Sequence, residues 1–219
     1  MDLGAIFDWD GVIIDSAKQH EESWEQLAAE EKLPLPPDHF KRSFGRKNEA
    51  IIPEIFGWTS DPVEIRRMSL RKEALYRELV VKQGTAPLPG VREFLQRLRE
   101  AGVPCAVGSS THRANIDTHF QITGIAPFFQ AIVTAEDVSV GKPDPQVFLL
   151  AAGKIAREPR RCIVFEDAYV GLQAARAGGM TAVAVATTNP AASLAPWADR
   201  VVARLDELGI ADLVTMVGN

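Results

Sequence analysis

Short apolar runs that alternate with helix-like stretches constrain the fold of this chain more than any other feature. Runs that are short and continuously apolar are typical of strands buried on both faces of a parallel sheet. Helical stretches with clear end signals lie between them. This alternation predicts an α/β fold with a doubly wound, Rossmann-like parallel sheet. The expected strands lie at 4–8, 104–110, 131–135, 162–167 and 181–187, and the expected helices at 90–101, 112–124, 145–157 and 168–178.

Residues 17–83 break this alternation because they contain no convincing strand. Apolar residues recur there at helical spacing, as Trp24 and Leu27 do on one face of the first stretch. Clusters of Pro, Gly, Ser and Asp separate the helical stretches and indicate loops. The pattern predicts a small helical bundle at 17–83, inserted into an α/β core formed by 1–16 and 84–219.

The composition sets limits on the partners and the location of the protein. The 219 residues are 46% hydrophobic, which is enough for one core and a small second domain. The net charge of −5 argues against binding to nucleic acid. No apolar run approaches the roughly 20 residues of a membrane span, and the first residues lack the order of a signal peptide. Cys105 and Cys162 lie in apolar runs and are expected to be buried free thiols of a reducing compartment, so we expect a cytoplasmic protein.

Polar side chains stand at the end of several expected strands. In an open parallel sheet, ligands bind beyond the carboxyl ends of the strands, so these groups are expected to converge on one rim. They are Asp8 and Asp10 after the first strand, Ser109, Ser110 and Thr111 after the second, Lys142 after the third, and Glu166 and Asp167 at the end of the fourth.

The combination of charges at this rim has a chemical logic. Four carboxylates around one point repel each other unless a cation lies among them, and hard oxygen ligands without histidine or cysteine suit Mg²⁺ better than zinc. A lysine, a serine hydroxyl and the N–H groups at helix starts suit an anion. Phosphate fits best, because Mg²⁺ and lysine neutralise its oxygens while a carboxylate attacks phosphorus.

Each motif also has a purely structural interpretation. The DWDG stretch alone can be a turn, and the serine cluster can cap the next helix. The GKPDP stretch can be a turn with a solvated lysine, and the acidic pair at 166–167 can favour a helix N-terminus. Their shared position at strand exits favours a site. Asp15 is expected to help start the first inserted helix rather than to take part in chemistry.

Four motifs then resemble those of a known family. FDWDGVIIDS, VGSSTHR, GKPDP and VFEDAYVG are similar, in order and spacing, to the motifs of the haloacid dehalogenase superfamily. The resemblance covers nearly the whole chain, and it is closest to the branch of β-phosphoglucomutase-like and sugar-phosphatase-like proteins. The insert at 17–83 resembles the small helical cap of that branch.

The resemblance implies a role for each of the catalytic candidates. Asp8 is implied to be the nucleophile that becomes an aspartyl phosphate. Asp10 is implied to be the general acid that protonates the leaving oxygen and then the base that activates water. Ser109 and Lys142 are implied to hold the transferring phosphoryl group, with Ser110 beside them as a substrate-binding residue.

The resemblance also implies a metal site for Mg²⁺. Asp167 is implied to bind the ion directly, together with Asp8 and the backbone carbonyl of Asp10. Glu166 is implied to support the ion, directly or through water.

The cap contains candidate residues for binding the part of the substrate that does not react. The stretch KRSFGRKN (41–48) has four cations and no acid, and Gly45 could let the backbone approach a ligand beside Arg46 or Lys47. A solvated basic helix face is the open alternative. The resemblance favours Arg46, but the mutase pattern has an arginine three positions after the glycine, where this chain has Asn48.

Two aromatic positions complete the expectations. The resemblance implies that His20 gates Asp10 from the hinge side of the cap; a packing role is the alternative. Trp9 is expected to pack against the cap.

Taken together, the sequence predicts a Mg²⁺-dependent phosphatase that hydrolyses a small phosphomonoester, a sugar phosphate, through an aspartyl phosphate. The alternative is a phosphosugar mutase of the β-phosphoglucomutase kind. A non-enzymatic binding protein on the same fold ranks below both, because every expected catalytic residue is present. We expect a monomer whose partner is a small phosphorylated metabolite.

Overall fold

A six-stranded parallel sheet forms the centre of the computed structural model, which describes residues 2–43 and 46–218. The strand order is β3-β2-β1-β4-β5-β6, which is the order of a doubly wound Rossmann-like sheet. The fold class expected from the sequence is therefore confirmed. The strands are β1 (Gly4–Phe7), β2 (Cys105–Gly108), β3 (Ala131–Val133), β4 (Cys162–Glu166), β5 (Thr181–Val185) and β6 (Arg200–Val202).

The register brings the ends of three strands together. β1 lies between β2 and β4, and Phe7 is paired with Val107 on one side and with Phe165 on the other. Asp8, Ser109 and Glu166 therefore stand at the same edge of the sheet.

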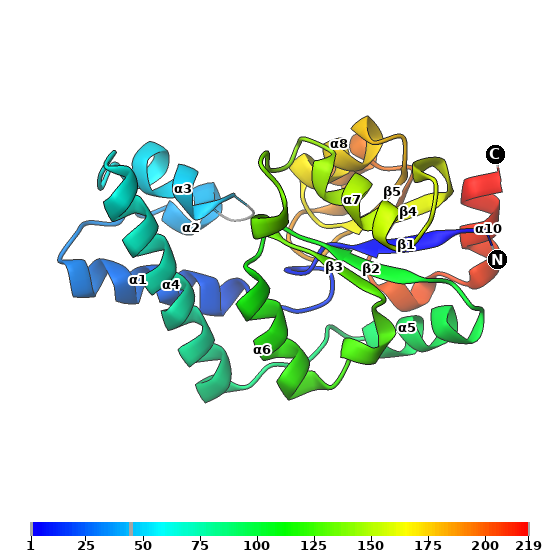
Figure 1. Cartoon of the computed structure of the whole chain (residues 1–219), viewed down its shortest axis with the longest axis horizontal. Helices are drawn as coiled ribbons and strands as arrows, with labels where there is room; N and C mark the ends of the chain where they lie inside the picture. Colours follow the sequence, from blue (N-terminus) through cyan, green and yellow to red (C-terminus); the bar gives the residue numbers. More distant parts are fainter. Residues whose placement is uncertain (1, 44–45, 219) are drawn as a thin grey trace.

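Helices cover both faces of the sheet because its strands carry apolar side chains on both sides (Figure 1). Ala5 and Phe7 face the core under α5, α6 and α10, whereas Ile6 faces the core under α7 and α8. These helices are α5 (Val91–Glu100), α6 (Arg113–Thr123), α7 (Gln146–Lys154), α8 (Tyr169–Ala177) and α10 (Ile210–Gly218); the short α9 (Ala191–Leu194) lies beside β5 and β6.

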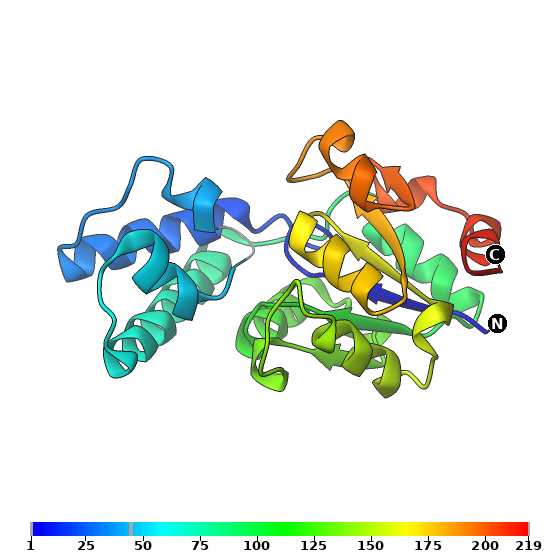
Figure 2. The same ribbon diagram turned by 90° about the horizontal axis from the view of Figure 1, so that it is seen from above.

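Residues 17–83 form a separate group of helices beside the carboxyl edge of the sheet (Figures 1 and 2). They have a hydrophobic core of their own, in which Trp24 and Leu27 pack against Phe56 and Met68. The elements are α1 (Ala17–Glu31), α2 (His39–Ser43), α3 (Asn48–Ala50), a π-helical turn (Ile51–Phe56) and α4 (Pro62–Gln83). We call this group the inserted helices; the domain boundaries and the role as a cap remain predictions.

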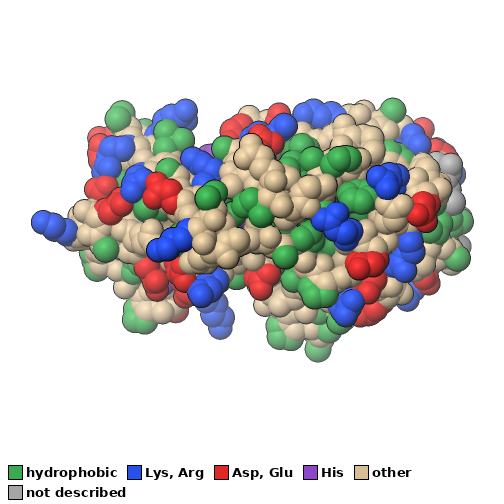
Figure 3. Space-filling model, turned by 90° about the horizontal axis from the view of Figure 1, so that it is seen from below, with side chains coloured by type: hydrophobic (Ala, Val, Ile, Leu, Met, Phe, Trp, Pro, Cys, Tyr) green, Lys and Arg blue, Asp and Glu red, His purple; other side chains and the backbone are tan. Residues whose placement is uncertain are grey.

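Charged side chains of both signs are interspersed on the surface face drawn in Figure 3. On the inserted helices, such pairs join α1 to α4, as Arg67 does with Glu31 and Arg71 with Glu30, each at 2.6 Å. Because these pairs are partly exposed, each contributes little to stability.

Three details differ from, or add to, the expectations. Trp9 does not pack against the inserted helices: it is fully buried in the core, where its ring contacts Phe120 of α6. The short strand β6 and the helix α10 were not expected. Cys105 and Cys162 are buried free thiols, as expected.

Among the residues that the structure describes, no helix is both long and apolar enough to cross a membrane.

Candidate active site

A single cleft lies between the carboxyl edge of the sheet and the inserted helices, and it gathers all the predicted site residues. The sheet side supplies the carboxylates, the serines and the lysine, and the inserted helices supply a histidine and an arginine. The predicted residues that line the cleft are Asp8, Asp10, His20, Arg46, Ser109, Ser110, Lys142, Glu166 and Asp167. Asp15 is exposed and does not line the cleft.

The chain leaves β1 in a way that points both aspartates into the cleft. Asp8 and Asp10 line the cleft, whereas Trp9 between them is buried in the core, which is the alternation of an extended chain. The chain then turns at Gly11, which has a φ of +77°, and a Cβ there would overlap with the carboxylate of Asp167. Glycine is needed at this position for both reasons.

Lys142 provides the positive charge beside the nucleophile candidate. Its Nζ lies 3.0 Å from Oδ1 of Asp8 and 2.7 Å from Oε1 of Glu166. Burial alone would lower the pKa of Lys142, but the two carboxylates outweigh burial and raise it, so the lysine is a cation. The second oxygen of Glu166 accepts the N–H of Ala168 at 2.7 Å.

Three carboxylates crowd around this one lysine. Asp8, Glu166 and Asp167 each offer an oxygen within 4.8 Å of the others. Burial, opposed by Lys142 and reinforced by Glu166 and Asp10, raises the pKa of Asp8 to about 7, and burial also raises the pKa of Asp167. One ammonium group does not balance three carboxylates, and the set of oxygen donors suits a hard divalent cation. The residues present therefore fit Mg²⁺.

The loop after β5 holds Asp167 in place. The hydroxyl of Thr188 donates to Oδ2 of Asp167, and the amide of Asn189 donates to its backbone carbonyl at 2.9 Å. Neither residue was predicted from the sequence, because both follow a strand whose end carries no charge.

Asp10 is held apart from the other carboxylates. The hydroxyls of Ser16 and Thr111 donate to its two oxygens, and Nε2 of His20 lies 3.4 Å from Oδ1. Burial would raise the pKa of Asp10, but His20 and the two hydroxyls outweigh burial and lower it, so Asp10 is a carboxylate in this arrangement. Its side chain does not join the acidic group around Lys142.

A buried network stands behind His20. Lys72 donates to Nδ1 of His20 at 2.7 Å, which leaves the N–H on Nε2 facing Asp10. Lys72 also forms an ion pair with Glu73 at 3.0 Å. Burial would raise the pKa of Glu73, but Lys72 and His20 outweigh burial and lower it to about 2. The packing alternative for His20 is realised, because its ring stacks on that of Tyr76 with the ring centroids 4.0 Å apart. The gating role remains a prediction.

This network was missed in the sequence, although a signal was present. Met68, Lys72, Leu75 and Leu79 recur at helical spacing, so a lysine falls on the apolar face of α4. A charge at such a position is buried and needs partners.

The serine cluster follows β2, at the start of α6. Ser109 is buried, and its Oγ accepts the N–H of Thr111 at 3.2 Å. Its own O–H therefore remains able to donate to a ligand.

Two cations of the basic stretch 41–48 have partners within the protein. The guanidinium of Arg46 lines the cleft and pairs with Glu54 at 2.6 Å. Lys47 reaches across to the sheet side, where its Nζ lies 3.4 Å from the carbonyl of Ala135. Gly45, expected to let the backbone approach a ligand, lies outside the described residues.

Comparison with known proteins matches most of the chain to a family. The family model of haloacid dehalogenase-like hydrolases covers residues 4–179, which include every carboxylate of the cleft, Lys142 and the inserted helices. The chain belongs to the haloacid dehalogenase-like hydrolases. The family resemblance seen in the sequence is confirmed.

Several relatives within the haloacid dehalogenase family are named phosphatases. A chloroplastic 5-amino-6-(5-phospho-D-ribitylamino)uracil phosphatase from Arabidopsis thaliana is 42% identical over 96% of this chain, which spans only 57% of that protein. The fructose-1-phosphate phosphatase YqaB of Escherichia coli is 31% identical over 83% of this chain and 95% of its own length. A β-phosphoglucomutase from Bacillus subtilis is 32% identical over 84% of both chains. The family and these relatives confirm the predicted enzyme class, a phosphoric monoester hydrolase.

Solved structures agree on the fold. A haloacid dehalogenase family hydrolase from Entamoeba histolytica has a TM-score of 0.90 at 24% identity, covering 99% of this chain and 100% of its own. A structure of CbbY from Rhodobacter sphaeroides in complex with phosphate has a TM-score of 0.88 at 21% identity, covering 97% and 99%.

Proposed function

We propose that this protein is a Mg²⁺-dependent phosphatase that hydrolyses the phosphomonoester of a small sugar or polyol through an aspartyl phosphate on Asp8. The observation that carries the proposal is the position of Asp8 at the rigid end of β1, with Lys142 at 3.0 Å and a separately held carboxylate, Asp10, two residues on. A nucleophile with a neighbouring acid–base group is the arrangement that such chemistry requires.

In the first half of the reaction, an oxygen of Asp8 forms a bond to phosphorus while the bond from phosphorus to the ester oxygen breaks. Asp10 gives its proton to the leaving oxygen. Lys142 and the free O–H of Ser109 stabilise the charge on the phosphoryl oxygens, with Ser110 on the same wall of the cleft.

In the second half, water attacks phosphorus, the bond to Asp8 breaks, and Asp10 accepts the proton from water. Asp10 is already the carboxylate that this step needs, because His20, Ser16 and Thr111 lower its pKa. For the first half it must gain a proton, which requires that some of these contacts loosen.

Asp8, Asp167 and the backbone carbonyl of Asp10 would hold Mg²⁺, with Glu166 in support. When bound, the ion supplies positive charge that neutralises the phosphoryl oxygens and separates the carboxylates.

The names of the relatives support a sugar-like substrate. Besides the ribityl and fructose phosphatases, they include a validoxylamine A 7'-phosphate phosphatase and a hexitol phosphatase. Each name describes a phosphate ester of a polyhydroxylated compound, and the polar side chains among the residues that line the cleft of this chain suit such a ligand. A small phosphorylated metabolite as partner, a cytoplasmic location and a monomeric state remain part of the proposal.

The position at which the mutase pattern carries an arginine favours phosphatase over mutase activity. Asn48 is buried there, and its amide donates to Ser69 at 3.1 Å and to Glu73 at 2.7 Å. The site therefore has no second phosphate-binding cation at this position.

Phosphate release from a panel of phosphomonoesters in the presence of Mg²⁺ tests the proposal. The panel should include sugar, hexitol and ribityl phosphates, and p-nitrophenyl phosphate. We expect Asp8→Asn and Asp10→Asn to abolish steady-state turnover, whereas Asp15→Asn, a carboxylate of the same segment outside the cleft, retains it. Wild-type rates in either of the first two variants would contradict the assigned roles. Interconversion of hexose phosphates that depends on a bisphosphate primer, without net phosphate release, would favour the mutase.

A further inference from the structure

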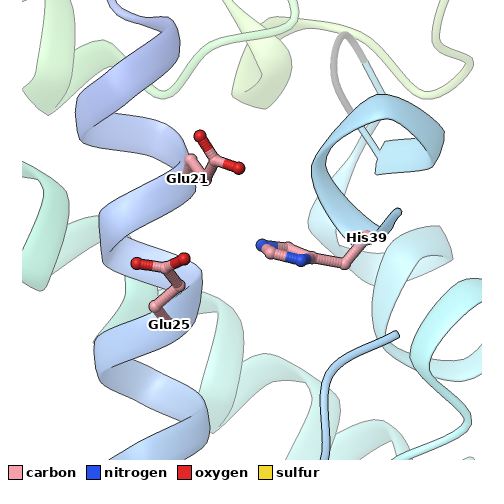
Figure 4. A group of neighbouring side chains, drawn as sticks. All are labelled: Glu21, Glu25 and His39. Carbon is pink, nitrogen blue, oxygen red and sulfur yellow. The ribbon is translucent and has the colours of Figure 1, made fainter. Parts of the chain in front are cut away.

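The inserted helices carry a second group of converging ligand atoms, apart from the strand-end cleft. Glu21 and Glu25 lie one turn apart on α1, and His39 is the first residue of α2 opposite them (Figure 4). One oxygen of each glutamate and one ring nitrogen of His39 lie within 4.8 Å of one another. None of the three lines the cleft described above.

His39 is the decisive member of this group. The residue is only 8% exposed, and its Nδ1 lies 3.1 Å from the carbonyl oxygen of Pro36. Since a carbonyl can only accept, Nδ1 carries the proton and Nε2 carries the lone pair. Nε2 is buried and has no hydrogen-bond partner among the described residues, which is rare for a buried polar atom.

The imidazole ring points from α2 toward the two glutamates (Figure 4). Among residues 2–43 and 46–218, the carboxylates of Glu21 and Glu25 have no hydrogen-bond or ion-pair partner. Two carboxylates and an imidazole lone pair are all acceptors, and the arrangement offers them no donor. A cation between them would satisfy all three.

We propose that Glu21, Glu25 and His39 bind a divalent transition-metal ion of the Zn²⁺ class. A mixed set of imidazole nitrogen and carboxylate oxygens suits such an ion, whereas the all-oxygen set of the cleft suits Mg²⁺. The bond from Nδ1 to a backbone carbonyl is the outer contact that fixes the orientation of metal-binding histidines.

The site has a consequence for the neighbouring cleft. It joins α1 to α2, and α2 carries Phe40 and Ser43, which line the cleft. A bound ion therefore fixes one wall of the substrate site without touching the reacting groups.

Zn²⁺ binding measured by isothermal titration calorimetry, with the full chain in saturating Mg²⁺, tests this site. We expect one Zn²⁺ ion per chain, and a loss of affinity of about tenfold or more in His39→Gln and in Glu25→Gln, because even an outer-shell partner is worth about 10–100-fold. Glu22→Gln changes a neighbouring carboxylate on the same helix outside the group and should bind as wild type does. Replacing Zn²⁺ by Co²⁺ should give visible absorption bands in the wild type that His39→Gln lacks.

Equal Zn²⁺ affinity in the wild type, His39→Gln and Glu25→Gln would place the ion elsewhere and overturn the proposal. The absence of any Zn²⁺ binding would also overturn it. Glu25 is exposed, so Glu25→Gln keeps the test valid if His39→Gln fails to fold. Phosphatase activity plays no part in this readout, so the two proposals stand or fall separately.

Discussion

The Nζ of Lys142 lies 3.0 Å from Oδ1 of Asp8, and both side chains are buried where β1 ends. The same nitrogen lies 2.7 Å from Glu166, so one ammonium group serves carboxylates from two neighbouring strands. The lysine thus balances part of the negative charge that the site needs for its chemistry.

Replacing Lys142 by methionine should lower kcat by about 100-fold or more, because a positive charge beside the transferring phosphoryl group is lost. Removing one partner of a buried ion pair also costs about 3–5 kcal/mol of stability, so Tm in EDTA should fall. Mg²⁺ should restore part of that loss. Lys154→Met, at a more exposed lysine on α7, is the control and should leave kcat unchanged. A Lys142→Met enzyme with wild-type kcat would refute the role of the lysine.

Gly171 of α8 leaves room for Glu166, because a Cβ at this position would overlap with the carboxylate. Gly171→Ala should therefore displace Glu166 from Lys142 and reduce activity. Gly153 of α7 has no atom within 4 Å of an added Cβ, so Gly153→Ala should keep full activity and gain up to about 1 kcal/mol of stability from helix propensity. Assays and urea unfolding of both variants check this contrast. Equal activity of the two would show that the position of Glu166 does not matter.

Arg46 borders the cleft while it pairs with Glu54, so it is placed to contact the part of the substrate that does not react. Arg46→Ala should raise KM by roughly tenfold, the equivalent of about 1.5 kcal/mol, with little change in kcat. Arg42→Ala removes an arginine of α2 that pairs with Asp38 and does not line the cleft, and it should leave both constants unchanged. An unchanged KM for Arg46→Ala on the best substrate would exclude this contact.

His119 of α6 is buried between Tyr76 and Thr85, and burial lowers its pKa to about 4 from the ordinary 6.5. Between about pH 6.5 and pH 4, His119 is therefore protonated in the unfolded chain but neutral in the folded chain. The free energy of unfolding should fall as the pH decreases through this range. The contribution is on the order of 3 kcal/mol. Chemical unfolding of the wild type and His119→Gln across this range measures it. If both proteins lose the same stability, His119 is not responsible.

The sequence predicted the sheet because its buried strands are continuously apolar, and they need no context to be recognised. The five expected strands all form, each with both ends within two residues of the expected ends. β6 was not predicted because it is a three-residue edge strand that begins with an exposed arginine, Arg200. The prediction that Trp9 packs against the cap was wrong because the chain stays extended from Asp8 to Asp10, so the side chain between these two aspartates points away from the cleft and into the core.

The carboxylates and the lysine of the site were predictable because charged residues directly after apolar strands are conspicuous in the sequence. The residues that hold these charges in place were less predictable. Thr111 was expected at the rim, but not as a hydrogen-bond donor to Asp10. Ser16 and Thr188 are ordinary loop residues in the sequence, and only the folded chain brings their hydroxyls to Asp10 and Asp167. The Glu21–Glu25–His39 group likewise joins two helices whose packing the sequence does not state.

Trapping the covalent intermediate tests the central claim most directly. Asp10→Asn should still react with p-nitrophenyl phosphate, whose leaving group needs no acid, but should lose the base that completes hydrolysis. After a brief reaction with Mg²⁺, acid quenching and borohydride reduction, peptide mass spectrometry should find Asp8 converted to homoserine. An unmodified Asp8 during phosphate release, or reduction at another carboxylate, would contradict the account.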